Sequence, residues 1–131
     1  MRCTVELDTK EMVERILGIH PQIRYVGIVD NEYHILESKQ REGIDSIAPE
    51  QVERNFISII PPIIVDAVRK LERYCGTART VSIRYDKLLL ILYQTQKYVI
   101  VLSFDPGAKT PFADKLASDL GKIVRATEDQ P

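Results

Sequence analysis

A chain of 131 residues, of which 44% are hydrophobic, is long enough to bury the core of one compact domain, so we expect a single domain over residues 1–131. Its 18 lysines and arginines are offset by 19 aspartates and glutamates, which gives a formal charge of −1. This balance provides no long-range field for nucleic acid or an anionic membrane. Nucleic acid is therefore not expected as a partner, and any basic site must be local.

The cysteines and the amino terminus give no sign of an oxidised or membrane-bound protein. Cys3 and Cys75 are far apart in the sequence and fit no CxxC pattern, so we expect neither a zinc site nor a disulfide framework. The opening "MRCTVELDTKEM" lacks the apolar core of a secretion signal, and no window reaches the roughly 18 apolar residues of a membrane span. We expect a cytoplasmic protein without a membrane partner.

The first third of the chain predicts one helix and a hairpin. Asp8 is a candidate helix cap, apolar residues follow it at helical spacing, and Gly18 supplies the stop. The runs "IRYVGIVD" (23–30) and "YHILESK" (33–39) are rich in β-formers and are separated by the short turn "NE". The first run is so apolar that we expect both of its sides to be covered.

Residues 49–75 predict a long helix that contains two adjacent prolines. Pro61 and Pro62 each remove one helical hydrogen bond, so either two helices meet there or one helix bends. The polar positions keep one helical phase across the prolines, which favours a single kinked helix of roughly seven turns with Pro62 on its wet side. The apolar arc spans about 160°, more than the roughly 100° that one sheet face needs. The excess predicts a second partner for this helix.

The second half of the chain predicts three strands and a last helix. "TVSIRYD" (80–86) alternates as a half-exposed edge strand does, whereas "LLLILYQ" (88–94) and "KYVIVLSF" (97–104) are the nearly continuous apolar runs of central strands. Thr110 and Pro111 are a candidate helix start. The prediction is an α+β domain with five mainly antiparallel strands and helices on both faces, in the order α-β-β-α-β-β-β-α.

This order resembles the roadblock dynein-light-chain family, a branch of the profilin-like and PAS-like folds. The stretch "YVGIVDNEYHILES" is similar to the opening hairpin of that family, and "YDKLLLILYQTQKYVIVLSFDPGAK" to its last strand pair. Residues 16–44 also look like the start of small uncharacterised proteins of ammonia-oxidising archaea. The resemblance implies a non-enzymatic homodimer that serves as an adaptor or regulatory platform, with a small GTPase as one partner class.

In roadblock-like dimers the long middle helix packs against its own copy and the third strand pairs edge to edge. Those elements correspond to residues 49–75 and 79–86, where the residue pattern itself leaves apolar surface and an edge strand. The Pro61–Pro62 pair departs from the uninterrupted helix of the family, so the dimer angle or the partner can differ. The expected dimer interface consists of Ile57, Ile60, Ile64, Val68, Leu71, Val81 and Ile83.

No residue pattern predicts an enzyme, a cofactor or a metal. The GxxxxGK[ST], GxSxG and HExxH motifs are absent from the sequence. His20 and His34 have no other histidine or cysteine at ligand spacing, so structural or surface roles are expected. Each acidic residue has a local explanation as a cap, a turn or a helix surface.

Two alternative functions remain open. The first is a PAS-like sensor that holds a small ligand between its sheet and the bent helix, where Gly27 and the bend leave room. The second is binding of nucleic acid or another polyanion through the cation-rich region from residue 69 to residue 87. Its candidate anion-binding residues are Arg69, Arg73, Arg79, Arg84 and Lys87.

Overall fold

The protein is a three-layered α+β structure built on one antiparallel sheet. The computed structural model describes residues 5–30, 32, 34–45, 47–95, 97–105 and 113–128. The strands lie in the order β2-β1-β5-β4-β3, and every neighbouring pair is antiparallel. The elements in chain order are α1 (Val5–Leu17), β1 (Ile23–Asp30), β2 (Ile35–Gln40), α2 (Glu50–Arg69), α3 (Glu72–Cys75), β3 (Thr80–Arg84), β4 (Leu89–Gln94), β5 (Tyr98–Phe104) and α4 (Ala113–Glu128).

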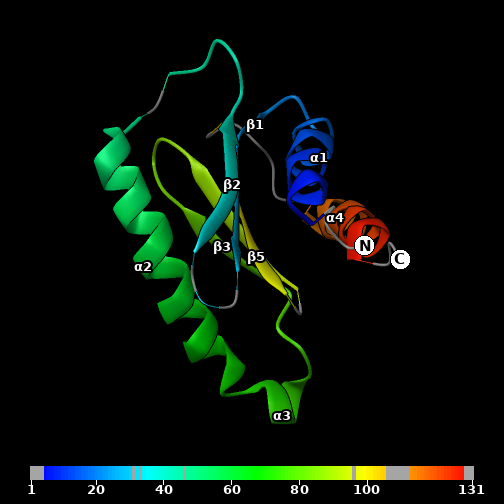
Figure 1. Cartoon of the computed structure of the whole chain (residues 1–131). Coiled ribbons are helices and arrows are strands. Elements are labelled where there is room, and N and C mark those ends of the chain that lie inside the picture. Colours follow the sequence, from blue (N-terminus) through cyan, green and yellow to red (C-terminus); the bar gives the residue numbers. More distant parts are fainter. Residues whose placement is uncertain are drawn as a thin grey trace.

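Helices cover both faces of the sheet, as the sequence predicts. The paired helices α1 and α4 lie on one face and α2 crosses the other, with α3 beyond its carboxyl end (Figure 1). Along β5, Ile100 and Leu102 face the α1/α4 side, whereas Val99 and Val101 face α2. The continuous apolar runs therefore do indicate central strands, because each supplies two cores at once.

The prediction of one helix through the prolines is confirmed, although two of its details are wrong. The helix α2 runs without interruption from Glu50 to Arg69 and contains both prolines. Pro62, expected on the wet side, is buried, as is Pro61. The two prolines therefore contribute buried apolar area as well as removing hydrogen-bond donors.

The helix also ends earlier than the expected residue 75. At its end Lys70 donates to the carbonyl of Ala67 and Leu71 to that of Val68, so the last turn tightens and the chain leaves the helix axis. The short helix α3 follows and stops at Gly76, which has a φ of 89°. The Glu72 carboxylate accepts a 2.8 Å hydrogen bond from the Ala78 amide, which holds α3 beside the start of β3.

The start of the first helix is also corrected. Asp8 lies inside α1, which is described from Val5, and does not cap it. The helical spacing continues back through Thr9, which is 4% exposed, so the core-facing stripe is longer than the purely apolar pattern indicates. The expected start of the last helix at Thr110 and Pro111 lies outside the described residues.

Arg41 joins three segments on the α1 side of the sheet. Its guanidinium donates to the carbonyls of Leu17 and His20 at 2.6 and 3.0 Å, and its Nε donates to that of Ile23 at 2.7 Å. These carbonyls belong to the end of α1 and the turn into β1, where helical bonding has stopped. One charged side chain thereby fixes where α1 meets the sheet.

We predict that Arg41→Met lowers the free energy of unfolding by about 2 kcal/mol, because partly buried carbonyls lose a charged donor while the aliphatic stem is kept. Urea unfolding measures the change. Lys39→Met is the matched control, because Lys39 lies in β2 two residues before Arg41 and makes an exposed ion pair with Glu14. Its expected effect is under about 0.5 kcal/mol, and equal losses in the two variants would contradict the role given to Arg41.

Candidate interaction surface

One exposed side of α2 carries large aliphatic side chains. Val52, Ile59 and Ile63 are 54%, 54% and 59% exposed, and their spacing of seven and four residues places them on one stripe. We call these three residues the outer ridge. An aliphatic stripe that no part of the described chain covers is typical of a contact surface.

The expected interface residues divide into an inner and an outer group. Ile57, Ile64, Val81 and Ile83 pack into the core between α2 and the sheet, and Ile57 is the most deeply buried of them. Ile60 and Val68 are partly buried, whereas Leu71 is 62% exposed. The structure therefore brings these residues to one side of the sheet at different depths.

Sequence reasoning misses the outer ridge as an exposed feature. None of its three members is among the expected interface residues, which follow a single apolar arc. The signal is nevertheless present, because Val52, Phe56, Ile59 and Ile63 recur at intervals of four, three and four residues, as in a second helical stripe. The expected interface treats the apolar residues of this helix as one wide arc, so the second stripe is not recognised as a separate surface.

The strand β3 ends the sheet next to this surface. It pairs with β4 on one side, and in the described part of the chain no strand pairs with its other side. Its side chains alternate, with Thr80, Ser82 and Arg84 exposed and Val81 and Ile83 turned to the core. The predicted edge strand is thus present, with backbone groups available to a further strand.

A small apolar projection lies beyond the carboxyl end of α2. We call residues 71–75 the α3 tip. Leu71 is 62% and Tyr74 76% exposed, and the Arg73 guanidinium lies 5.5 Å from the centre of the Tyr74 ring. Cys75 is exposed and forms no disulfide in the described chain. The tip is the most exposed aromatic site among the described residues.

A cavity of about 600 Å³ lies at the other end of α2, between its first turns and the sheet. Its wall is mostly apolar and includes Ile47, Val52, Phe56, Leu88 and Val101, with Tyr85 and Asp86 beside the end of β3. This volume falls in the range of small-molecule sites. The cavity lies between the sheet and a helix, as the ligand-sensing alternative requires, but at the first turns of α2 and not at the prolines, and Gly27 is not among its lining residues.

Gly27 determines how Tyr25 enters this cavity. A Cβ atom at position 27 would lie 2.8 Å from the Tyr25 hydroxyl and 3.1 Å from its ring, so the tyrosine folds over its own strand only because the glycine has no side chain. Burial raises the pKa of the Tyr25 phenol, and the nearby Glu53 carboxylate raises it further, against an opposing hydrogen bond from Ser38. The phenol therefore stays neutral and can donate a hydrogen bond.

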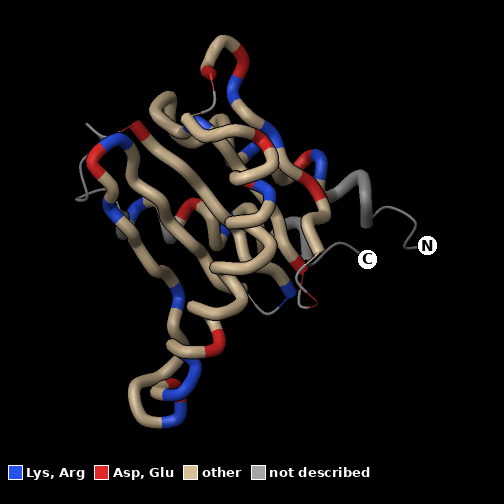
Figure 2. The backbone as a smooth tube through the Cα atoms, turned by 90° about the vertical axis from the view of Figure 1, so that its left-hand side faces the viewer, with Lys and Arg blue, Asp and Glu red and all other residues tan. Residues whose placement is uncertain are grey.

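The candidate anion-binding residues are exposed but do not form one cluster. Arg69 precedes the α3 tip, Arg73 belongs to it and Arg79 precedes β3, whereas Arg84 and Lys87 lie at the far end of that strand. Arg84 lies five positions after Arg79 along extended chain, a distance of roughly 16 Å. Figure 2 shows the cations interrupted by acidic residues in both regions, so no single basic patch is formed among the residues that the structure describes.

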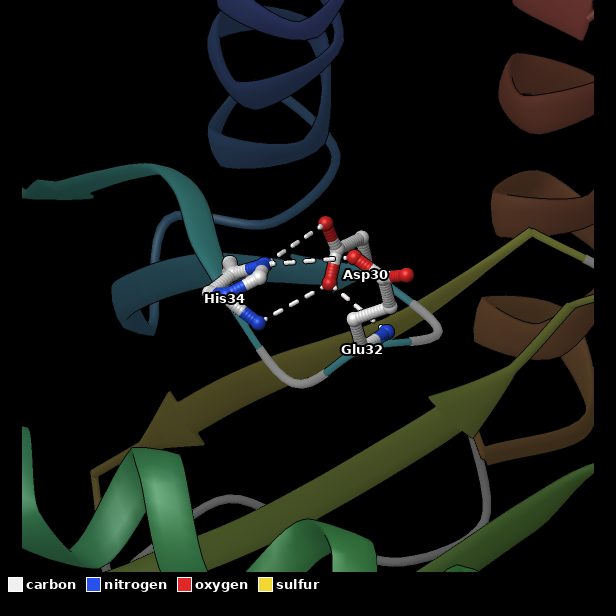
Figure 3. Close-up of side chains that lie close together, drawn as sticks. All are labelled: Asp30, Glu32 and His34. Atoms are coloured by element: carbon white, nitrogen blue, oxygen red, sulfur yellow. Dashed lines mark hydrogen bonds and ion pairs between the residues drawn. The ribbon is translucent and has the colours of Figure 1, made fainter.

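The turn between β1 and β2 brings Asp30, Glu32 and His34 together (Figure 3). One Asp30 carboxylate oxygen accepts 2.9 Å hydrogen bonds from the backbone amides of Glu32 and His34, and the other lies 3.4 Å from His34 Nδ1. The Glu32 and His34 side chains are well exposed. These contacts close the hairpin and explain the arrangement as a turn, which is the role expected for the acidic residues.

No helix in the described ranges combines the length and the apolar character that crossing a bilayer requires. No family model matches the sequence, and no curated protein matches it significantly.

Solved structures share the fold over nearly the whole chain. The gliding protein MglB of Thermus thermophilus superposes with a TM-score of 0.68 at 15% identity, over 93% of this chain and 92% of that one. A structure described as MglB with a tetrameric arrangement gives 0.68 at 16%, covering 94% and 92%. A Roadblock/LC7 domain from Streptomyces avermitilis gives 0.67 at 10%, covering 90% and 92%. The chain therefore has the roadblock fold, as its sequence predicts.

We predict that Asp30→Asn removes part of the pH dependence of stability. Partial burial acts to raise the Asp30 pKa, but hydrogen bonds from the His34 and Glu32 amides outweigh it and lower the pKa. A lowered pKa stabilises the fold above the ordinary aspartate value of about 3.9, and this contribution is lost as the pH falls through the folded-state pKa. Unfolding at pH 7 and at pH 3 measures the difference, which the variant should reduce, whereas Glu32→Gln should not. An unchanged difference in Asp30→Asn would contradict the assignment.

Proposed function

We propose that the protein is a non-enzymatic homodimer that acts as an adaptor or regulatory platform. The observation that carries the proposal is the outer ridge of α2 beside the unpaired edge of β3. Three exposed aliphatic residues cost solubility in an isolated domain, and an open edge strand invites association. A second copy offers both features a matching surface, because each would meet its own equivalent.

The size of the available surface supports a stable dimer. A standard interface buries roughly 800 Å² on each partner. The outer ridge, the partly buried Ile60 and Val68, and the exposed edge of β3 together extend along most of the 20 residues of α2, a length of about 30 Å. Helix contacts supply apolar area, and a strand pair would add backbone hydrogen bonds that fix the register.

The partner of such a platform is proposed from the resemblance of the sequence. Roadblock-like relatives scaffold or regulate small GTPases, so a small GTPase is the first class to test. One MglB structure is described as a tetrameric arrangement, which supports further assembly in proteins of this fold. The sequence contains no GxSxG nucleophile motif and no GxxxxGK[ST] phosphate loop, and this supports the choice of a binding role for the proposal.

A ligand-sensing role is the second candidate, and the cavity favours it. Apolar walls with a neutral phenol and the Glu53 carboxylate suit a mainly apolar molecule that carries a hydrogen-bonding group. The polyanion alternative receives less support, because its cations are divided between the two ends of β3.

We predict that light scattering at micromolar concentration gives twice the chain mass of 15.0 kDa. Ile59→Asp combined with Ile63→Asp should give a monomer of unchanged fold, because both side chains are more than half exposed and two charges would face their equivalents. Lys10→Asp, on the exposed side of α1, is the control and should remain dimeric. A wild-type monomer at this concentration would sink the proposal.

The same variants test the platform role. Small GTPases loaded with GDP or a non-hydrolysable GTP analogue should be retained by the wild type and by Lys10→Asp. The monomeric variant should retain them at least about tenfold less well if their site spans both copies.

For the ligand-sensing candidate, native mass spectrometry should detect a bound apolar molecule or thermal shift against a metabolite panel should find one. Ser103→Leu should abolish the shift, because Ser103 lines the cavity and a larger side chain there fills it. Ser118→Leu, an exposed change on α4, is a size-matched control. Equal shifts in both variants would place the ligand elsewhere.

A further inference from the structure

We infer that the cavity is closed by the α3 tip of a second copy of this chain, so that each copy completes the wall of the other. This inference rests on the proposed homodimer and goes further, because it assigns a place to the two most prominent features of the surface. One is an apolar cavity beside the end of β3, and the other is an apolar tip before its start.

The proposed contacts determine the direction of the two-fold axis of the dimer. If β3 pairs with its own copy and both α2 helices remain on the same face of the joined sheet, the two-fold axis must be perpendicular to the sheet. Such an axis makes both the strand pair and the helix pair antiparallel. The carboxyl end of one α2 then lies beside the amino end of the other.

Pairing of β3 with its own copy brings the end of one strand beside the start of the other. In an antiparallel pair centred on Ser82, Arg84 of one copy is opposite Thr80 of the second. The residues that follow β3 therefore meet those that precede β3 in the second copy. Tyr85 and Asp86, which line the cavity, are in the first group, and the connection from the α3 tip is in the second.

Pairing of the two α2 helices independently places the α3 tip of one copy beside the cavity of the other. The exposed Ile59 and Ile63 lie symmetrically about Pro61, so each faces the other's equivalent when antiparallel helices are centred there. Leu71 lies ten residues after this centre and Gln51 ten before, about 15 Å in each direction. Tyr74 of the second copy is then opposite the segment that contains Ile47, which is 48% exposed and lines the cavity.

The charges of the two regions are complementary. Residues 69–73 contain three cations and one acid, and that acid, Glu72, already accepts a hydrogen bond from Ala78. Residues 45–54 contain three acids and one arginine. Antiparallel helices bring these opposite charges together, whereas parallel helices would bring like charges together. The helix dipoles favour the same arrangement.

The shapes and polarity also agree. Leu71 and Tyr74 expose an aliphatic and an aromatic group, and the facing wall offers Ile47, Val52 and Phe56. Tyrosine is suited to such a place because its ring can be buried while its hydroxyl reaches a polar rim. Tyr74→Ser should therefore raise the dissociation constant of the dimer at least about tenfold, with the monomer fold unchanged.

A disulfide between two different chains tests the contact directly. One chain carries Cys3→Ser and keeps the exposed native Cys75. The other carries Cys3→Ser, Cys75→Ser and Ile47→Cys. After mixing and mild oxidation, we expect a covalent dimer that contains one chain of each kind.

A third chain with Cys3→Ser, Cys75→Ser and Lys10→Cys is the control and should form no disulfide with the first, because Lys10 lies on the opposite face. A light-scattering dimer without the disulfide from position 47 would overturn this inference and leave the proposed function intact. Efficient pairing of Cys75 with its own copy would also overturn it, since it indicates parallel helices. A monomer would overturn both proposals.

Discussion

The structure depends on a sheet whose central strands are apolar on both sides. Strands β1, β4 and β5 have buried residues in succession, so neither face can be left to water, and the chain must supply a cover for each. Among the described helices, α1 and α4 lie on one face, whereas α2 is the one that crosses the other. A single helix is narrower than a five-stranded sheet, and the uncovered remainder appears as the cavity at one end and the half-buried β3 at the edge.

The difference in helix cover between the two faces of the sheet explains why α2 is more apolar than a usual surface helix. Its inner side must be rich in aliphatic residues, and two of the four buried residues of the helix are prolines. Ile59 and Ile63 of the outer ridge are more than half exposed, so they add little to the cover of this sheet, whereas Val52 also borders the cavity. Two separate apolar stripes on one helix therefore correspond to two layers, one inside the chain and one that a partner would provide.

The sequence predicts the strands more accurately than the surface. The runs at 23–30 and 97–104 are recognisable because they are apolar without a helical period, and β1 and β5 occupy them almost residue for residue. The early end of α2 is not predictable from Lys70 and Leu71, both good helix formers, because the contact between Glu72 and Ala78 is made across a bend. The burial of Pro62 is missed for a related reason. The helical period predicts the direction of a side chain from the helix axis, but it does not predict which other parts of the chain cover that side chain.

The closeness of Asp30, Glu32 and His34 could be expected from a tight hairpin, whereas the cavity could not, because it is defined by a separation between α2 and the sheet. The outer ridge lies between these cases: its spacing is visible in the sequence, but its exposure depends on where the inner stripe is centred.

Gly27 connects the backbone of the sheet with the free space beneath α2. The Tyr25 ring rests against β1 because the neighbouring position is bare. The Tyr25 ring forms part of the cavity wall. Gly27, the smallest residue of β1, therefore determines where the ring of Tyr25 lies. An alanine at this position would place its Cβ against the Tyr25 ring, so the ring would have to move and one wall of the cavity would change shape without any substitution in α2.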